Sequence, residues 1–337
     1  MKGFIERNNN LRVLDSCIIF SSLLVILFSC SKIYESEDFD ELPNPYKNKT
    51  SSEFIAVFGD IQYYTFEEYI QLYKNSLNWL EENQDEINIL CVLCTGDIIH
   101  STSQQWKFFD EAMEGFTLPF ISNIGNHDYN WKNGLIYDRY DTFFNEHNQF
   151  PLLTSRIENY FEDGRIENIV VRNEIQGQRY DLLLLEFGPR KEVVAWAKEW
   201  VAEHPDIKYI LMTHEYLEQG GGRRTSGLKS ELQLRNTTMT SPNELWEQLI
   251  TCNDNIVCVL CGHVGGLYAV TFEKNDFGRE VCQIQHNIQS QKYRYDNWLM
   301  MWEFPNDSDD AVVSIVNTKT GRLYDSKEAL FKFKYRY

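Results

Sequence analysis

Five β-rich runs in this chain of 337 residues each end in a side chain that can bind a metal ion. The polar ends are Asp60, Asp97, the run Asn126–Asp128, His214 and His263, and a glycine directly precedes four of them. A single aspartate after a strand is usually a turn or cap residue, but five such ends are hard to produce by chance. In an open α/β sheet, ligands collect beyond the carboxyl ends of the strands, so we expect these side chains to meet. The glycines would let the backbone turn sharply and approach an ion closely.

The β-rich runs alternate with amphipathic helical patterns. The strands are expected at 53–58, 87–94, 119–124, 208–212 and 255–261, a hairpin at 168–187, further strands beyond 267, and an edge strand at 331–337. Helices are expected after a capping-box pattern at 65–68 and at 191–203. Strands that alternate with helices in this way predict a layered α/β domain.

The two CxxC pairs do not predict a zinc site. Cys258 and Cys261 are three residues apart on an expected strand, so their side chains should point to opposite faces of the sheet. Cys91 and Cys94 repeat the same pattern. A zinc-binding pair of this spacing needs a turn, and both pairs are therefore expected in the core. The sequence leaves any disulfide pairing open.

The first thirty residues predict export. Basic residues precede an apolar run at 17–29, which as a helix would rise only about 20 Å, too little to cross a bilayer. The end of this run resembles a bacterial lipobox, in which Cys30 would be acylated; an ordinary signal peptide is the alternative. We therefore expect a lipoprotein signal peptide at 1–29 and an acidic, flexible tether at 30–52. The protein would be anchored through lipid in the bacterial cell envelope, at the outer membrane on its periplasmic or surface side, with the membrane as a partner.

The net charge of −18 limits the kinds of partner that the protein can bind. A surface this acidic repels a phosphate backbone, so no nucleic-acid binding is expected.

The strand-end motifs resemble those of the calcineurin-like metallophosphoesterase family. The family order is GDxH, GDxx[DHN], GNHD, a lone histidine after a strand, and GHxH; this chain has GDIQ at 59–62, GDIIH at 96–100, GNHD at 125–128, His214, and GHVG at 262–265. The resemblance covers residues 53–304. It implies a four-layer αββα sandwich with mixed sheets over a domain at 53–337, with extra C-terminal strands from about 305. It also implies hydrolysis of a phosphoester, mono- or diester, by a hydroxide that bridges two divalent metal ions.

The resemblance assigns roles to eight residues. They are Asp60 and Gln62 at the first metal site, Asp97 as the bridging ligand, Asn126, His214 and His263 at the second metal site, and His127 and Asp128 as the catalytic pair. His127 would donate to the phosphate or the leaving oxygen and would be oriented by Asp128. Two cations about 3.5–4 Å apart lower the pKa of a shared water and neutralise charge on a phosphorylated small molecule or other phosphoester substrate.

The first site departs from the family pattern, because Gln62 and Gly265 replace two histidines. An oxygen-rich first site favours Mn²⁺ or Mg²⁺, whereas Fe or Zn suits the second site. The alternative function is a non-catalytic or weakly active ligand-binding lipoprotein that keeps the fold with one metal site degraded. A structural surface protein with a vestigial cleft is a third hypothesis.

Three further features allow two interpretations each. Arg223 and Arg224 follow a triple glycine and would either contact a substrate phosphate or belong to a solvated loop. His100 would orient Asp97 from outside the metal site or lie on the surface. His286 would line the cleft or face solvent from a strand.

Overall fold

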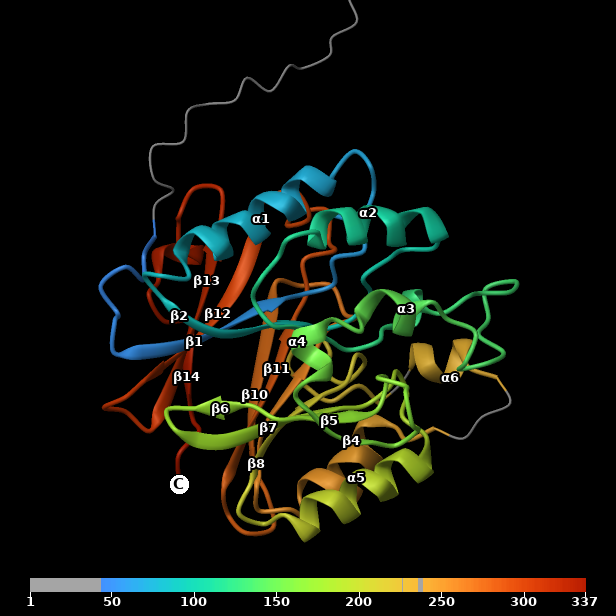
Figure 1. Ribbon diagram of the computed structural model, residues 1–337. Coiled ribbons are helices and arrows are strands. Elements are labelled where there is room, and N and C mark those ends of the chain that lie inside the picture. The colour runs from blue at the N-terminus through green and yellow to red at the C-terminus, as the bar shows by residue number, and fades with distance from the viewer. Residues whose placement is uncertain (1–43, 226, 236–238) are drawn as a thin grey trace, which may run out of the picture. The chain divides into compact units, whose positions relative to one another are not determined.

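The computed structural model describes residues 44–337 except 226 and 236–238. In this part of the chain two β-sheets lie between two layers of helices (Figure 1). The expected signal peptide, Cys30 and most of the expected tether lie outside the described residues. A search of the described helices finds no segment long and apolar enough to span a bilayer.

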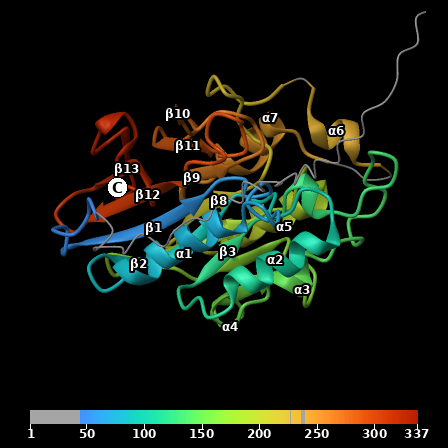
Figure 2. The ribbon, with the colours of Figure 1, turned by 90° about the horizontal axis from the view of Figure 1, so that it is seen from above.

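The first sheet has six strands in the order β14-β13-β12-β1-β2-β3. Its strands are β1 (Ser52–Phe58), β2 (Asn88–Cys94), β3 (Phe120–Ser122), β12 (Trp298–Pro305), β13 (Asp310–Asn317) and β14 (Phe331–Lys334). The strands β1, β2 and β3 run parallel to one another, and β12 pairs antiparallel with β1. The helices α1 (Ile70–Asn83) and α2 (Ser103–Met113) cover this sheet and lie side by side (Figures 1 and 2). The expected edge strand at the C-terminal end is confirmed as β14.

The second sheet has eight strands in the order β10-β11-β9-β8-β7-β5-β4, with β6 paired to β7. Its strands are β4 (Ile157–Tyr160), β5 (Ile169–Val171), β6 (Glu174–Ile175), β7 (Gln178–Leu184), β8 (Lys208–Met212), β9 (Ile256–Cys261), β10 (Tyr268–Lys274) and β11 (Glu280–His286). The strands β7, β8, β9 and β11 run parallel. The helix α5 (Lys191–Glu203) covers the outer face, as Figure 1 shows.

Shorter helical segments connect these elements. They are η1 (Asn126–Asp128), α3 (Phe144–Asn148), α4 (Pro151–Thr154), α6 (Lys229–Gln233), α7 (Pro242–Leu245), the π-helix η2 (Trp246–Ile250) and η3 (Tyr324–Ser326). With these elements the chain forms the four-layer αββα sandwich with mixed sheets that the resemblance implied.

Side chains alternate between two hydrophobic cores along the central strands. Leu182 and Leu184 of β7 join the larger core, which also contains residues of α1 and α2, while Leu183 joins the core beneath α5. Parallel strands covered on both faces need such continuous apolar runs. Cys258 and Cys261 divide between the same two cores, so the prediction that they cannot hold one ion together is confirmed. The cysteines of the described chain are all free.

The structure corrects two predicted boundaries, the start of the first helix and the start of the folded domain. The helix α1 begins at Ile70, because the Thr65 hydroxyl donates to the carbonyls of Gln62 and Ile98 and so fixes a loop instead of capping a helix. The folded domain also includes residues that the sequence analysis assigned to the tether. Tyr46 is buried, and its hydroxyl is 2.8 Å from that of Ser314.

Candidate metal centre

The polar strand ends from the two sheets lie together. Asp60, Asp97 and Asn126 follow the parallel strands β1, β2 and β3, and His214 and His263 follow β8 and β9. The His263 N–H donates to Asp60 Oδ2 at 3.0 Å, so the carboxyl ends of both sheets meet at one place. This convergence was predicted from the sequence.

Four acceptor atoms from these strand ends point at one another. His214 Nε2 is 3.2 Å from Asp97 Oδ1 and 3.2 Å from His263 Nδ1, and His263 Nδ1 is 3.0 Å from Asn126 Oδ1. Within the described residues, Asp97, His214 and His263 form a group whose ligand atoms lie within 4.8 Å of one another.

Each histidine has one ring nitrogen that points away from this group. The partner of that nitrogen indicates that it carries a hydrogen. His214 Nδ1 is 2.7 Å from the Thr95 carbonyl oxygen, which can only accept, so Nδ1 carries a hydrogen. His263 Nε2 lies 3.4 Å from a carboxylate oxygen of Glu215, which favours a hydrogen on that nitrogen. When both rings are neutral, two imidazole lone pairs and two oxygens face the same space, and a divalent cation fits this donor set.

The electrostatics of the group are those of a cation site. Burial alone would lower the pKa of His214, but the carboxylates of Asp97 and Asp60 raise it to about 10. Burial raises the pKa of Asp97, and the neighbouring histidines His214 and His127 outweigh burial and hold it well below its usual range. Positive charge is thus strongly favoured beside Asp97, whether a proton or a metal ion supplies it.

Two of the glycines leave room for acidic side chains of this centre, whereas their approach to an ion stays a prediction. A Cβ atom on Gly125 would lie 2.2 Å from Asp97 Oδ1, and one on Gly262 would lie 2.2 Å from Asp60 Oδ1. Asp97 and His263 themselves adopt left-handed backbone angles, with φ of 53° and 68°. Strained backbone of this kind persists only where the surrounding structure enforces it.

Asp128 enforces the backbone around Asp97. Its carboxylate accepts the N–H groups of Gly125, Asp97, Ile98 and Ile99 at 2.8–3.2 Å. The expectation that Asp128 orients the His127 ring is therefore wrong, because all its bonds go to these backbone groups.

The His127 ring is held by other groups. Its Nδ1 donates to the His100 carbonyl, 2.5 Å away, and its ring stacks between those of His100 and Trp131. His100 stacks in turn on Tyr63, and the Arg294 guanidinium lies 3.6 Å from the centre of that ring. In the described structure His127 Nε2 has no hydrogen-bond partner.

The predicted first metal site has a different environment. The Asp60 carboxylate accepts from Thr95 Oγ1, from the His263 N–H, and from the side-chain amides of Asn287 and Gln289. Burial raises the pKa of Asp60, and the charge of His214 and the hydrogen bonds from His263 and Thr95 oppose this shift. The Gln62 carbonyl oxygen was expected to face an ion there.

Instead, Gln62 Oε1 is 2.7 Å from His100 Nδ1, and Gln62 Nε2 donates to Asp97 Oδ2 at 3.1 Å. His100 therefore contacts Gln62 and not Asp97. A Cβ atom on Gly265 would meet nothing within 4 Å, so the place of the missing histidine is open.

The remaining candidates lie elsewhere. Arg223 pairs with Glu273 and stacks on Trp246, so it is held by the second sheet and its neighbouring helical segment and does not serve as a free phosphate contact. Arg224 Nε is 3.4 Å from Glu215 Oε1, the carboxylate oxygen that also faces His263 Nε2, so Arg224 lies beside the centre. His286 is fully buried, and its Nδ1 is 2.7 Å from the Leu267 carbonyl oxygen.

Sequence reasoning missed four residues of this site: Thr95, Glu215, Asn287 and Gln289. The last two follow β11, which runs parallel to β9 and whose carboxyl end reaches the same place. The available signal was a β-rich run followed by polar residues, and Asn287 and Gln289 lie just after its last residue, His286.

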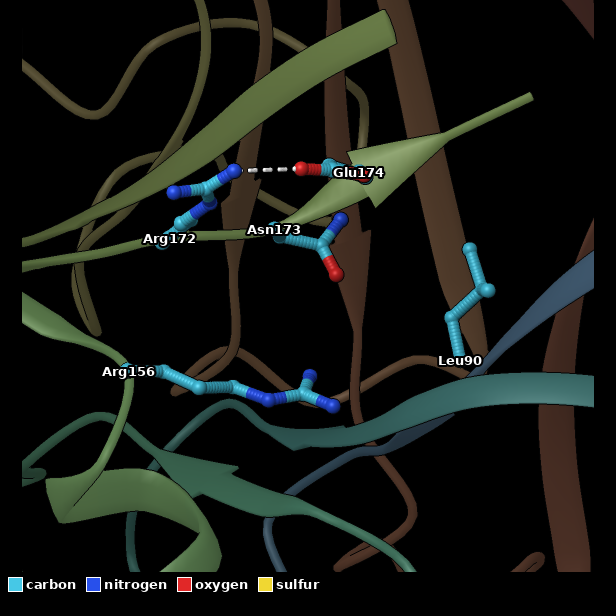
Figure 3. Close-up of a pocket in the computed structure, with 5 residues that line it drawn as sticks. All are labelled: Leu90, Arg156, Arg172, Asn173 and Glu174. Atoms are coloured by element: carbon cyan, nitrogen blue, oxygen red, sulfur yellow. Dashed lines mark hydrogen bonds and ion pairs between the residues drawn. The ribbon is translucent and has the colours of Figure 1, made fainter. Parts of the chain in front are cut away.

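A pocket of the structure lies away from this centre. It is lined by Leu90, Arg156, Arg172, Asn173 and Glu174, and an ion pair joins Arg172 to Glu174 (Figure 3). Leu90 belongs to the beginning of β2, whereas Asp97 follows the end of that strand. The pocket therefore has no part in the candidate centre.

The layered sheets and the convergent Asp, Asn and His side chains define an αββα fold with a candidate metal centre between its two sheets. The family model for calcineurin-like phosphoesterases matches residues 55–266, and the chain belongs to this family.

Two curated relatives are similar to parts of the chain. The Bacillus subtilis protein YvnB, described as uncharacterised, is 27% identical over 299 residues, covering 85% of this chain and 21% of that protein. A probable glycerophosphodiester phosphodiesterase, GpdQ, of Arcobacter nitrofigilis is 29% identical over 124 residues, covering 36% of this chain and 40% of that protein. The matches thus span less than half of either relative. A purple acid phosphatase, PPD1, from yellow lupin (Lupinus luteus) seeds aligns with a TM-score of 0.49 at 14% identity over 83% of this chain and 54% of that chain.

Proposed function

We propose that this protein hydrolyses phosphoesters with the help of a divalent cation held by Asp97, Asn126, His214 and His263. The observation that carries the proposal is the convergence of Asp97 Oδ1, Asn126 Oδ1, His214 Nε2 and His263 Nδ1, which three contacts of 3.0–3.2 Å join into one group. Membership of the family supports it, because the family implies metal-dependent phosphoester hydrolysis at a dinuclear centre. The histidine ligands suit Fe or Zn, and Mn²⁺ or Mg²⁺ would also serve.

A divalent cation at this site would lower the pKa of bound water and neutralise charge on phosphoryl oxygens. The chain supplies the orientation. Because the His127 Nδ1–H donates to the His100 carbonyl, Nε2 is the other ring nitrogen, and it would donate to the phosphoryl or leaving oxygen when the ring is the imidazolium ion. The stack with His100 and Trp131 holds the ring plane, which supports a positioned proton donor.

The substrate class is proposed to be a phosphodiester or monoester on a small molecule. The name of one relative, a probable glycerophosphodiester phosphodiesterase, supports a diester. The proposed location is the bacterial cell envelope, with a lipid on Cys30 as the anchor. The apolar run and lipobox-like residues at 17–30 support this location.

A non-catalytic or weakly active binding lipoprotein remains the second candidate. The observation that favours it is the environment of Asp60, whose carboxylate is surrounded by amide and hydroxyl donors.

The test is hydrolysis of a chromogenic diester and the matching monoester by the purified full chain with added Mn²⁺. We expect turnover that is lost in Asp97→Asn, which keeps the shape of the side chain but not its charge. Asp110→Asn, at an exposed position on α2, is the control that should retain full activity. Absence of turnover with Mn²⁺, Mg²⁺, Zn²⁺ and Fe²⁺ would favour the binding lipoprotein.

A further inference from the structure

We infer that the amide groups of Gln62 and Gln289 take the place of the first metal ion, so that this centre holds one cation per chain. The inference rests on the proposed function for the second site and departs from the dinuclear centre that the family implies.

Both oxygens of the Asp60 carboxylate already accept hydrogen bonds. Oδ1 accepts from Thr95 Oγ1 at 3.1 Å and from the His263 N–H at 3.1 Å. Oδ2 accepts from Asn287 Nδ2 at 2.6 Å, from Gln289 Nε2 at 3.0 Å, and from the same N–H at 3.0 Å. A metal ion would have to displace hydrogens that already point at both oxygens.

A chain of hydrogen bonds joins the carboxylates of Asp97 and Asp60. Gln62 Nε2 donates to Asp97 Oδ2 at 3.1 Å and to Gln289 Oε1 at 2.8 Å. Gln289 Nε2 then donates to Asp60 Oδ2 and, at 2.8 Å, to the His263 carbonyl oxygen. The two amides therefore bridge Asp97 and Asp60, which an ion at the first site would otherwise do.

The direction of both amides is determined by their neighbours. Gln289 Nε2 faces a carboxylate oxygen and a carbonyl oxygen, so turning the amide over would place its own oxygen against two acceptors. Asn287 is held in the same way, because its Oδ1 accepts the Gln289 backbone N–H at 2.8 Å. Gln62 Oε1 is occupied by His100 Nδ1, and Gln289 Oε1 accepts from Gln62 Nε2. Neither glutamine therefore offers an oxygen to an ion.

Three residues of this network are buried. Asp60 and Gln62 are each 1% exposed, and Asn287 is fully buried. If an ion displaced the amides of Gln62 and Asn287, they would lose their partners without gaining water, which is unfavourable for a buried polar group. The network is therefore a structural replacement for the ion, and it leaves Asp97 Oδ1 directed toward His214 and the second site.

The test is the number of metal ions bound by the purified full chain. After removal of metal with a chelator, Mn²⁺ is added back in excess, free ions are removed, and bound manganese is measured by elemental analysis. We expect one ion per chain in the wild type, and none in His214→Ala. Two ions per chain would overturn the inference and leave the proposed function intact. No bound ion would instead overturn the proposed function, and the inference with it.

A gain of the second ion provides an independent measurement. The triple variant Gln62→His, Gly265→His, Gln289→Ala restores both family histidines and removes the bridging amide, so we expect it to bind two ions. Gln71→Ala, at an exposed glutamine of α1, is the matched control and should keep the stoichiometry at one. A crystal of the wild type soaked in Mn²⁺ should show one anomalous peak beside Asn126 and none beside Asp60. A second peak there would contradict the inference even if the triple variant failed to fold.

Discussion

The carboxylate of Asp128 accepts the backbone N–H of Asp97 at 2.9 Å and thereby holds Asp97 in a left-handed conformation with φ of 53°. Three more N–H groups bond to the same carboxylate. We predict that Asp128→Asn lowers the free energy of unfolding by about 1–3 kcal/mol, because an amide has one acceptor oxygen where the carboxylate has two.

Equilibrium urea unfolding would measure this loss. The same variant should weaken Mn²⁺ binding, since the loop that presents Asp97 would lose its anchor. Asp85→Asn changes an exposed aspartate after α1 and should alter stability by less than about 0.5 kcal/mol. If Asp128→Asn matched this control in stability and in metal affinity, the positioning role would be wrong.

His127 should affect turnover without affecting the ion. We predict that His127→Asn reduces kcat for phosphoester hydrolysis by about 10²–10⁴-fold, the usual contribution of a positioned proton donor. Asparagine can still donate to the His100 carbonyl but lacks the distal nitrogen. Bound manganese should stay unchanged, which separates this variant from loss of a ligand. An unchanged kcat would show that Nε2 does not contact the reacting phosphoryl group.

The cation should stabilise the fold. A ligand that binds only the folded state at 100 times its Kd adds about 2.7 kcal/mol to the free energy of unfolding. We therefore predict that excess Mn²⁺ raises the Tm of the wild type and that a chelator reverses the rise. In Asn126→Ala and in His263→Ala the rise should be much smaller, because each removes one atom of the convergent group. An equal rise in these variants would place the stabilising ion elsewhere.

Much of this centre was predictable because the signals were local. Each ligand directly follows a buried apolar run, and parallel strands must end at the same side of a sheet, as Asp60 and Asp97 do. The division of Cys258 and Cys261 between two cores followed from the period of a strand in the same way.

The other contacts were not predictable for physical reasons. The direction of the Asp128 carboxylate depends on loop dihedral angles that no residue pattern encodes. Asn287 and Gln289 are neutral amides after a strand, a composition that is common in ordinary turns. Their role depends on the pairing of β11 with β9, which brings both amides to the Asp60 carboxylate.

His286 should make stability depend on pH in a defined window. Burial lowers its pKa to about 4, and its Nε2 is buried without a partner in the described structure. The unfolded chain, with a histidine pKa of about 6.5, binds the proton more readily than the folded chain. Stability is therefore complete above about pH 6.5 and is lost as the pH falls toward 4, by up to about 3 kcal/mol.

His286→Asn keeps a donor for the Leu267 carbonyl but cannot titrate. Urea unfolding at pH 7 and pH 5 should show a smaller loss in this variant than in the wild type. His204→Asn is the control, because His204 is half-buried with its Nδ1 on the Trp200 carbonyl. Equal losses in the wild type and in His286→Asn would assign the acid sensitivity to other groups.

A single cation beside several carboxylates should favour substrates with less negative charge. Asp60 and Asp128 are buried near Asp97, and the amides of Gln62 and Gln289 are neutral where an ion would carry two positive charges. At an effective dielectric constant of about 20, two unit charges roughly 5 Å apart interact by about 3 kcal/mol. A phosphomonoester dianion carries one more negative charge than a diester monoanion, so the missing ion costs the monoester more.

We predict that kcat/KM for a diester exceeds that for the monoester with the same leaving group by at least about tenfold, which corresponds to about 1.4 kcal/mol. Both rates should be measured at pH 8, where the monoester is a dianion. In the triple variant with two histidines and no Gln289, a second ion should shift the ratio toward the monoester. A wild-type preference for the monoester would mean that other positive charge compensates the carboxylates. Arg294, which lies over the Tyr63 ring, would be the first residue to replace with glutamine in that case.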